Sequence, residues 1–320
     1  MKSAQMDQLI KKQIEDAQKF VIVSHIRPDG DAIGSALAFA SALREFGKTV
    51  QCVLQDGVAE RYRYLPGTIE VATEISLDYD YLIVVDSADR HRVGDVLDGH
   101  PKPNLVIDHH KTHIDFGELE YVEPDTEATA LLLVDKMPDW GLAISKDTAT
   151  CLMVGLLGDT LGFRTNNTTP RALRTAADLM EKGVDLVQVY HQTLSMRSLA
   201  EIRYWGQGLT KLVLKDGVLS STLTLNDRIV AGYMENDDAD LINTLTVVPE
   251  ALISVMFIEQ ENNSVKISWR SVKGLDVSVI AEKFGGGGHA SAAGADIAGE
   301  LDEVKEMVLA ETQRYLNTKG

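Results

Sequence analysis

Histidine and aspartate residues follow several apolar runs of this 320-residue sequence. Three runs, FVIVSHIRPDGD, YLIVVDSAD and LVIDHH, end in acidic or imidazole side chains, and Asp159 follows a fourth run, CLMVGLLG. Carboxylate oxygens and imidazole nitrogens bind pairs of divalent ions, which activate water and neutralise the charge that develops on phosphorus in phosphoryl hydrolysis. The pattern therefore predicts a dinuclear metal site.

The first of these runs offers three candidate ligands within seven residues. His25 ends a predicted strand, and Asp29 and Asp31 lie in the turn that starts a helix. A local alternative explains both carboxylates, because Asp29 with Gly30 can form a turn and Asp31 can cap the helix. A cap requires no upstream histidine, however, and Gly30 and Gly34 would let the turn and helix approach the sheet closely. These features favour a functional motif.

Two further strand ends carry candidate ligands. Asp86 closes the run YLIVVD, where its two oxygens could bridge two ions, although an aspartate that begins a turn is the alternative. Asp108, His109 and His110 combine a ligand, a partner that orients a ligand, and a phosphate contact. The alternative for this triplet is a solvated polar loop that continues to His113.

Asp159 follows an apolar helical run and precedes Arg164. A helix-ending aspartate is the alternative. If each local alternative were correct, all four segments would have to carry such side chains at one edge of one sheet by chance. The joint pattern therefore favours a metal site.

A glycine-rich segment, FGGGGHASAAG at residues 284–294, offers a different chemistry. Backbone N–H groups of glycines can form an anion-binding nest, and His289 adds a donor. Arg270, at the end of the run VKISWR, could grip a phosphate with two N–H groups. A flexible connector and an ordinary surface arginine are the alternatives. The candidate substrate-binding residues are Arg270, Gly286, Gly287, Gly288 and His289.

The elements that would position the metal site are those of an α/β fold. Continuous apolar runs at FVIVSH, TVQCVL, YLIVVD and LVIDHH predict a mainly parallel sheet buried on both faces, and LEYVEP adds a further candidate strand. The segment DAIGSALAFASALREFG predicts a helix that ends at Gly47. In such doubly wound sheets ligands bind outside the carboxyl ends of the strands, where the candidate ligands lie.

The sequence changes character beyond about residue 195. Two hairpin-like pairs, LTKLVLKDGVLSSTLTL and ALISVMFIEQENNSVKISWRS, predict a second, smaller mixed α/β domain. We expect a metal-binding domain at 1–185, a helical linker at 186–208 and a substrate-binding domain at 209–320.

Composition limits the class of protein and of substrate. Hydrophobic residues make up 44% of the chain, as in ordinary globular proteins, and the net charge of −17 opposes binding of long nucleic acids. The amino-terminal residues contain neither a signal-peptide core nor a membrane-spanning run, so we expect a cytoplasmic protein with no membrane partner. Cys52 and Cys151 lie in apolar runs typical of buried thiols. A homodimer is compatible with the sequence.

The motifs together resemble those of the DHH–DHHA1 phosphoesterases. The resemblance covers nearly the whole chain and rests on HIRPDGDAIGSALA, VVD, the DHH triplet itself, GLLGDT and GGGGHASAAG, in the family's order. It is greatest for the stand-alone NrnA-like branch, described as degrading nanoRNA and dephosphorylating 3'-phosphoadenosine 5'-phosphate (pAp).

The resemblance implies a role for each candidate residue. It implies two manganese ions, with Mg²⁺ or Co²⁺ as alternatives, held by six residues: His25 and Asp29 on one ion, Asp31, His109 and Asp159 on the other, and Asp86 between them. His110 would face the scissile phosphate, and Asp108 would steady the neighbouring imidazoles. Arg270 and the GGGGH run would hold the end of the nucleotide opposite the cleaved bond.

The expected function is therefore metal-dependent hydrolysis of phosphoester bonds. The substrates implied are very short oligoribonucleotides, cleaved to mononucleotides, and pAp, converted to AMP and phosphate. A cyclic di-AMP or pApA phosphodiesterase is the nearest rival, and inorganic pyrophosphatase is a further one. A non-catalytic nucleotide sensor is the rival from another class.

Overall fold

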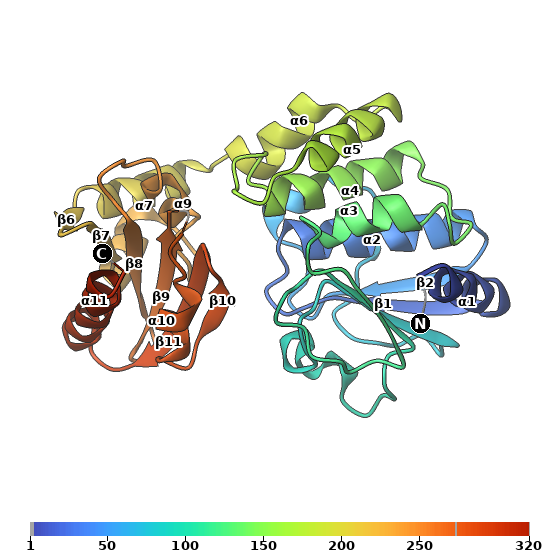
Figure 1. Cartoon of the computed structure of the whole chain (residues 1–320), viewed down its shortest axis with the longest axis horizontal. Coiled ribbons are helices and arrows are strands. Elements are labelled where there is room, and N and C mark those ends of the chain that lie inside the picture. Colours follow the sequence, from blue (N-terminus) through green and yellow to red (C-terminus); the bar gives the residue numbers. More distant parts are fainter. Residues whose placement is uncertain (1–2, 273, 320) are drawn as a thin grey trace. The chain divides into compact units, whose positions relative to one another are not determined.

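The computed structural model describes residues 3–272 and 274–319. The chain divides into two compact units, Met1–Met196 and Arg197–Gly320, whose course Figure 1 colours from blue to red. The division falls inside the stretch 186–208 for which a helical linker is predicted. Among the described residues, no helix combines the length and apolar character needed to cross a bilayer.

The first unit contains a five-stranded sheet in which every pair of neighbours is parallel. Its order is β2-β1-β3-β4-β5, so the direction of strand addition reverses between β1 and β3. The strands are β1 Lys19–Val23, β2 Thr49–Val53, β3 Tyr81–Val85, β4 Leu105–Asp108 and β5 Leu119–Val122. This sheet and the separate mixed sheet of the second unit confirm the predicted α/β fold class.

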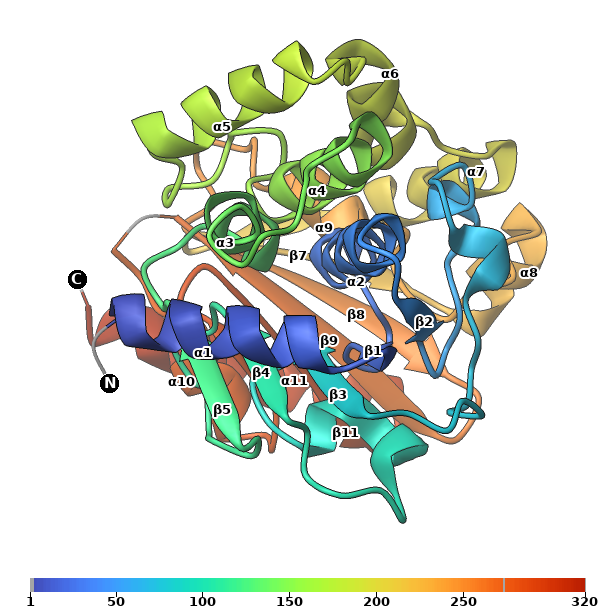
Figure 2. The ribbon, with the colours of Figure 1, turned by 90° about the vertical axis from the view of Figure 1, so that its right-hand side faces the viewer.

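Helices cover one face of this sheet. The helical elements are α1 Ser3–Asp16, α2 Gly30–Glu45, η1 Glu60–Tyr62, η2 Thr68–Glu70, η3 His91–Leu97, α3 Thr129–Lys136, α4 Lys146–Asp159, α5 Pro170–Glu181, α6 Leu186–Tyr190 and the π-helix η4 His191–Ser195. Residues of α1 to α4 form one large core with the sheet face that carries Phe20 and Ile22 (Figure 2). Val21 and Val23 face the other way, into a smaller core closed by η3 and loops. The sheet is thus buried on both faces, as its continuous apolar runs predict.

Glycines allow α2 and α4 to touch. A Cβ atom at Gly34 would clash with the carbonyl oxygen of Cys151 and lie 2.9 Å from the backbone nitrogen of Gly155. The close approach predicted for Gly30 and Gly34 therefore occurs, but its partner is α4 rather than the sheet. This contact matters for the site because α2 carries Asp31 and α4 ends at Asp159.

The second unit is built on a six-stranded mixed sheet of order β10-β11-β9-β8-β7-β6. Its elements are α7 Leu199–Leu209, β6 Val213–Lys215, β7 Val218–Leu223, α8 Leu225–Ala231, α9 Leu241–Leu245, β8 Ile253–Gln260, β9 Ser264–Ser271, α10 Ser278–Glu282, β10 Gly287–His289, β11 Ala292–Ala298 and α11 Leu301–Asn317. Both predicted hairpins form, β6 with β7 and β8 with β9, and their turns place Asp216 and Asn263 at positive φ. β7 and β8 pair in parallel.

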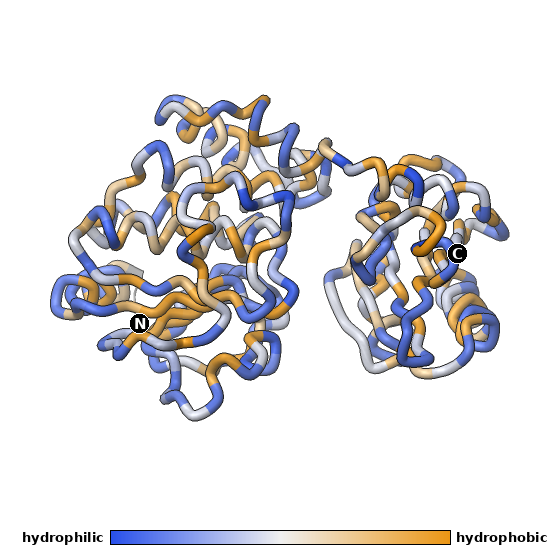
Figure 3. Tube along the Cα trace, turned by 180° about the vertical axis from the view of Figure 1, so that it is seen from behind, coloured by the Kyte–Doolittle hydropathy of each residue, from blue (hydrophilic) through white to orange (hydrophobic). Residues whose placement is uncertain are grey.

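Two cores sandwich this second sheet. One contains Trp269 and packs against α10 and α11, and the other contains Met256 and packs against α7 and α9. In Figure 3 apolar segments concentrate along the strands of the first unit. Cys52 and Cys151 are buried free thiols, as predicted.

Candidate metal centre

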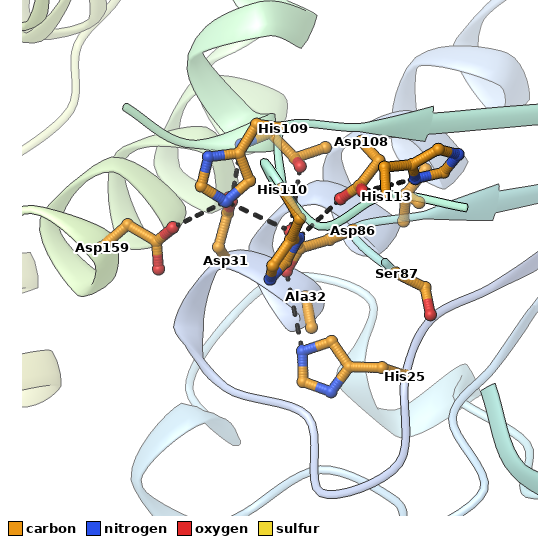
Figure 4. A network of polar contacts seen from close by, with 12 residues as sticks. His25, Asp31, Ala32, Asp86, Ser87, Asp108, His109, His110, His113 and Asp159 are labelled. Atoms are coloured by element: carbon orange, nitrogen blue, oxygen red, sulfur yellow. Dashed lines mark hydrogen bonds and ion pairs between the residues drawn. The ribbon is translucent and has the colours of Figure 1, made fainter. Parts of the chain in front are cut away.

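Candidate ligands meet at the carboxyl edge of the parallel sheet. They come from the segments after β1, β3 and β4, from the first turn of α2, and from the last residue of α4 (Figure 4). Because parallel strands end at the same edge, their carboxyl-terminal side chains converge although they are distant in sequence. Three overlapping groups place one ligand atom per residue within 4.8 Å of the others: His25, Asp29 and Asp86; Asp31, His109 and Asp159; and Asp86, His109 and His110.

The ring of His25 is oriented by the backbone carbonyl of the next residue. Its Nδ1 lies 2.8 Å from the carbonyl oxygen of Ile26, so this nitrogen donates, and Nε2 is the nitrogen that can offer a lone pair to a cation once it loses its proton. Nε2 lies 3.8 Å from Oδ2 of Asp29 and 3.7 Å from Oδ2 of Asp86. The side chain is 3% exposed. A lone pair on a buried ring, with two carboxylates opposite, is the arrangement a divalent cation needs.

Asp29 and Asp31, the two aspartates of the first motif, have different structural roles. Asp29 is the N-cap of α2, where its Oδ1 accepts from the backbone nitrogens of Asp31 and Ala32, while Oδ2 faces His25. The local alternative in which Asp31 caps the helix is therefore wrong. Asp29 combines the capping role with a position suited to a ligand, so the two interpretations of this motif are compatible.

Asp31 turns away from its own helix terminus into the protein. Its Oδ2 accepts from the backbone nitrogen of Thr129 at 2.6 Å, and Oδ1 accepts from Ala130 N at 2.9 Å and from Ser35 Oγ at 3.1 Å. The first turn of α3 thus supplies two unpaired helical N–H groups to a carboxylate, a favourable contact with the helix dipole. This carboxylate is fully buried and held in one orientation.

Asp86 presents its two oxygens to different imidazoles. Oδ2 lies 3.7 Å from Nε2 of His25, and Oδ1 lies 3.7 Å from Nε2 of His109. Oδ1 also accepts from the hydroxyl of Thr129 at 2.9 Å. The backbone of Asp86 has φ +56°, a left-handed conformation that costs about 1 kcal/mol or more for a residue with a Cβ. The strained residue lies where a bridging ligand is expected.

His109 and Asp159 form the other side of the centre. Nδ1 of His109 lies 3.1 Å from the carbonyl oxygen of Thr126 and donates to it, which leaves Nε2 to face the carboxylates. Nε2 lies 3.0 Å from Oδ2 of Asp159 and 3.9 Å from Oδ2 of Asp31. The same donor pattern as in His25 therefore recurs on a second ring.

Burial and mutual charge shift the pKa values of these groups. Burial lowers the pKa of His25, but Asp86 and Asp29 outweigh it and raise that pKa to about 9. Burial raises the pKa of Asp86, but hydrogen bonding and charge from His25, with His110 and His109, lower it to about 2. Burial with nearby carboxylates raises the pKa of Asp159 to about 6 against the opposite effect of His109. A cation bound here has to displace protons from the rings.

His110 is directed by Asp108 rather than by the backbone. Its Nδ1 donates to Oδ1 of Asp108 at 2.7 Å, and its ring stands edge-on to that of His109, with centroids 4.9 Å apart. Asp108 is fully buried. Burial raises its pKa, but hydrogen bonds from His110 and His113 outweigh this effect and hold that pKa far below the usual range. His113 is therefore buried against the site rather than part of a solvated loop.

The donor set fits two divalent cations. Each of the two rings has Nδ1 on a backbone carbonyl and Nε2 among carboxylate oxygens, as metal-binding histidines usually do. His110 joins one of the groups, the other members are carboxylates, and neither cysteine belongs to these groups. Oxygen-rich sites with imidazole suit Mn²⁺, Mg²⁺ or a similar ion better than thiophilic metals.

Comparisons with known sequences decide the family. A pattern described as the DHH family, N-terminal domain, matches residues 19–156, and the DHHA1 domain matches residues 226–317. A Thermus thermophilus protein named bifunctional oligoribonuclease and PAP phosphatase NrnA is 36% identical over 93% of this chain and 90% of its own length. The chain belongs to the DHH family. Like these relatives, it is a hydrolase that acts on phosphoester bonds.

Two other comparisons show how far the similarity extends. The cyclic-di-AMP phosphodiesterase GdpP of Bacillus subtilis is 26% identical over 91% of this chain but only 46% of its own length. The crystal structure of an exopolyphosphatase-related protein from Bacteroides fragilis superposes with a TM-score of 0.89 at 24% identity, covering 99% of this chain and 96% of that one. The second comparison shows that the two proteins share a fold.

In the DHHA1 domain, two hydrogen bonds fix the side chain of Arg270. Its Nε donates to Oδ1 of Asn243 at 2.8 Å, and Nη1 donates to the carbonyl oxygen of Trp269 at 2.9 Å. Burial lowers the pKa of Arg270, partly offset by Asp238 and Asp240. Burial also raises the pKa of Asp238 to about 6, although a hydrogen bond from Ile242 N and the charge of Arg270 oppose it. Arg270 is therefore a fixed cation rather than an ordinary surface arginine.

The second half of the glycine run forms an edge strand rather than a flexible connector, and Gly285 lies in the turn before it at φ +74°. Gly287 to His289 form β10, which pairs antiparallel with β11. Ala292 of β11 lies opposite both His289 and Arg270, so these two side chains project from the same face of the sheet with a small residue between them. Gly288 has φ +142°, and a Cβ there would lie 2.6 Å from Cα of Ala293. Only glycine lets this edge strand approach β11.

Sequence reasoning missed several residues that hold candidate site residues in place. Ser35 and Thr129 hold carboxylates of the metal centre, and Asn243 holds Arg270. Ser35 carried a usable signal, because it follows Asp31 by four residues and shares its helix face. Thr129 and Asn243 act across long sequence separations, and nothing local distinguishes them.

Proposed function

We propose that this DHH-family chain hydrolyses very short oligoribonucleotides to mononucleotides and converts pAp to AMP and phosphate, using two Mn²⁺ ions. The observation that carries the proposal is Asp86, whose two oxygens face two separate groups of donors. The named activity of the Thermus thermophilus relative, matched along 93% of this chain, supports these substrates.

The proposed ligands are those implied by the family resemblance. His25 and Asp29 would hold one ion, Asp86 would lie between the two, and the second ion would be held by Asp31, His109 and Asp159. When bound, such ions supply positive charge beside the phosphate and increase the acidity of water. Asp86 has a strained backbone, and the Thr129 hydroxyl holds its Oδ1, so the carboxylate would keep its orientation during the reaction.

We assign His110 to the phosphate. Asp108 accepts its Nδ1–H, which directs the opposite ring atom, Nε2, away from that carboxylate. Burial lowers the pKa of His110, but the hydrogen bond with Asp108 and the charge of Asp86 outweigh this and raise it. A protonated Nε2–H can donate to a phosphate oxygen and stabilise the negative charge that grows there.

The DHHA1 domain would hold the nucleotide by a second anionic group. Arg270 and His289 project from one face of the sheet, and Gly286 to Gly288 keep the edge strand free of side chains there. Asn243 fixes the guanidinium, so little conformational entropy is lost when a phosphate binds. Because the chain has a net charge of −17, it opposes binding of long nucleic acids, and a phosphate group would depend on a local cation such as Arg270.

A substrate panel tests the proposal. The purified chain would be assayed with Mn²⁺ and with EDTA on pAp, pApA, cyclic di-AMP, RNAs of two to five nucleotides, and pyrophosphate. We expect mononucleotides from the RNAs and phosphate from pAp, loss of both with EDTA, and recovery with Mn²⁺. Activity that survives removal of metal, or activity on pyrophosphate alone, would contradict the proposal. Binding without turnover would instead support a nucleotide sensor.

A second candidate substrate is cyclic di-AMP or its linear product pApA. The 26% identity to GdpP along 91% of this chain favours it. The same panel separates the two candidates, because a cyclic dinucleotide presents no free terminal phosphate to Arg270. Turnover of cyclic di-AMP at least as fast as that of the short RNAs would favour this second function.

A further inference from the structure

A buried histidine lies behind the candidate phosphate-facing residue. The side chain of His113 is 6% exposed. Its Nδ1 lies 2.7 Å from Oδ2 of Asp108, and its Nε2 lies 3.0 Å from Oε2 of Glu120. Asp108 thus accepts from two imidazoles, His110 on one oxygen and His113 on the other. The four side chains form one hydrogen-bonded row, His110, Asp108, His113 and Glu120, most of which is visible in Figure 4.

The far end of this row is anchored to the sheet. Glu120 belongs to β5, opposite Val106 of β4, and its Oε1 accepts from the backbone nitrogens of Phe116 and Gly117 at 2.8 and 2.5 Å. A Cβ at Gly117 would lie 2.7 Å from a methyl carbon of Val106, so the tight loop that delivers these donors requires glycine. Both oxygens of Glu120 are engaged, and the carboxylate has a single orientation.

The near end depends on this anchor. Asp108 is fully buried, and both of its oxygens are paired only while both rings stay in place. Loss of His113 would leave one buried carboxylate oxygen without its donor, which is costly and frees the carboxylate to rotate toward another partner. His110 takes its ring orientation from that carboxylate, so the disturbance would reach the ring.

The charges in the row agree with this geometry. Burial lowers the pKa of His113, but hydrogen bonds with Asp108 and Glu120 raise it to about 9. An imidazolium between two carboxylates donates from both nitrogens, which neutral histidine cannot do. Asp108 is therefore held as an acceptor on both sides.

We propose that His113 and Glu120 are positioning residues that act on His110 through Asp108. The proposal rests on the proposed function in so far as His110 contacts the phosphate. It assigns no contact with substrate to His113 or Glu120. They contribute by fixing the orientation of the His110 ring before substrate binds.

A third metal ion is the competing explanation of the same residues. Nε2 of His113, Asp115 and Glu120 also form a group of potential ligands. The Asp115 side chain is 84% exposed, however, and its nearest oxygen lies 4.0 Å from Nε2, whereas Glu120 already occupies that nitrogen at 3.0 Å. Replacement of Asp115 therefore distinguishes the two explanations. A metal site would need its carboxylate, whereas the hydrogen-bonded row does not.

Kinetic measurements on paired variants test the proposal. We expect His113→Leu and Glu120→Leu to lower kcat about 10- to 100-fold with KM changed less than about threefold, as for residues that orient catalytic groups. His113→Asn, which retains one N–H for Asp108, should recover part of the loss. Asp115→Ala and the exposed His91→Leu should match the parent chain. A KM effect alone, or a large loss in Asp115→Ala with loss of a bound ion, would overturn the proposal.

A double-mutant cycle shows whether His113 acts through His110. If it does, His113→Leu should cost little more once His110→Ala is present, because both changes remove the same interaction. Fully multiplicative losses would overturn the proposal. Any phosphoester that the parent chain cleaves serves here, so failure of the short-RNA assignment leaves this test intact.

A spectroscopic readout needs no turnover. In metal-free protein, the Nδ1–H proton of His110 should give a downfield NMR signal from its hydrogen bond to Asp108. We expect His113→Leu to broaden or shift that signal and Asp115→Ala to leave it unchanged. An unaltered His110 signal in folded His113→Leu would contradict the positioning role, whatever the substrate proves to be.

Discussion

The candidate metal centre of the first unit and the Arg270 face of the second are built in opposite ways. His25, Asp31 and Asp86 are almost completely buried, and each is fixed by backbone groups or neighbouring side chains. Around Arg270, by contrast, one tethered cation stands near an exposed strand of glycines that ends in His289. One region concentrates charge in the interior, and the other leaves a surface open.

This difference teaches what each region must accomplish. Buried carboxylates and imidazoles repel or titrate one another unless a cation completes the set, so the first region has the arrangement of a candidate metal site. An exposed glycine edge lets part of a substrate approach its backbone closely and suits reversible contact. We therefore expect changes in the first region to affect kcat and changes in the second to affect KM.

The largest expected effect follows replacement of Asp86. We predict that Asp86→Ala lowers kcat on the order of 10³-fold or more, because the two donor groups lose their shared member. Circular dichroism and thermal unfolding should show that the fold persists. The control is Asp139→Ala, which removes an exposed carboxylate of the same unit. Normal rates for Asp86→Ala with Mn²⁺ would contradict the bridging role.

A smaller loss is expected at Thr129. Thr129→Val removes the hydroxyl that holds Oδ1 of Asp86 and keeps the backbone N–H that holds Asp31. We predict that the Mn²⁺ concentration for half-maximal activity rises about 10- to 100-fold. This is the usual effect of removing a residue that hydrogen-bonds to a metal ligand. Thr129→Ser should recover most of it. The control is Thr150→Val, whose hydroxyl bonds within α4.

Replacement of Arg270 tests the role of the second region. We predict that Arg270→Ala raises KM for pAp and short RNA about 10- to 100-fold, the range of about 1.5 to 3 kcal/mol for a hydrogen bond to a charged group. Hydrolysis of a small chromogenic phosphoester, which has no second anionic group, should persist. Lys266→Ala changes a cation on the same face of β9 and serves as the control. Equal losses on both substrates would remove the distinction between the two regions.

The smallest effect concerns pH and stability. The pKa of His113 is raised from 6.5 to about 9 in the folded chain, so protonation of this ring stabilises the fold. That contribution is complete below about pH 6.5, declines as pH rises, and is lost above about pH 9. In EDTA, the difference in unfolding free energy between the parent and His113→Asn should shrink over this range in urea titrations. A difference that is constant with pH would contradict the prediction.

Much of the first region could be predicted because its signals are local. Continuous apolar runs identify parallel strands, and parallel strands bring the residues at their carboxyl ends to one edge of the sheet. His25, Asp86 and the Asp108 to His110 triplet were accessible to sequence reasoning for this reason. Asp159 could be added because it ends an apolar helix, although its approach to Asp31 depends on glycines whose contact partner the sequence does not reveal.

The rest depends on contacts between distant segments. Thr129 meets Asp86 across 43 positions, and β7 pairs in parallel with β8 through two intervening helices. No short-range pattern specifies either contact. The glycine run misleads for another reason, since glycine usually indicates a turn or linker. Its role as an edge strand depends on β11, which leaves no room for a side chain at Gly288.

Metal stoichiometry measured together with electron paramagnetic resonance tests the central claim most directly. The claim is that Asp86 joins two neighbouring cation sites. We predict that the parent chain binds two Mn²⁺ per molecule with a spin-coupled signal, and that Asp86→Asn loses the coupling together with at least one ion. A single bound ion, or two ions with independent signals in the parent chain, would contradict the account.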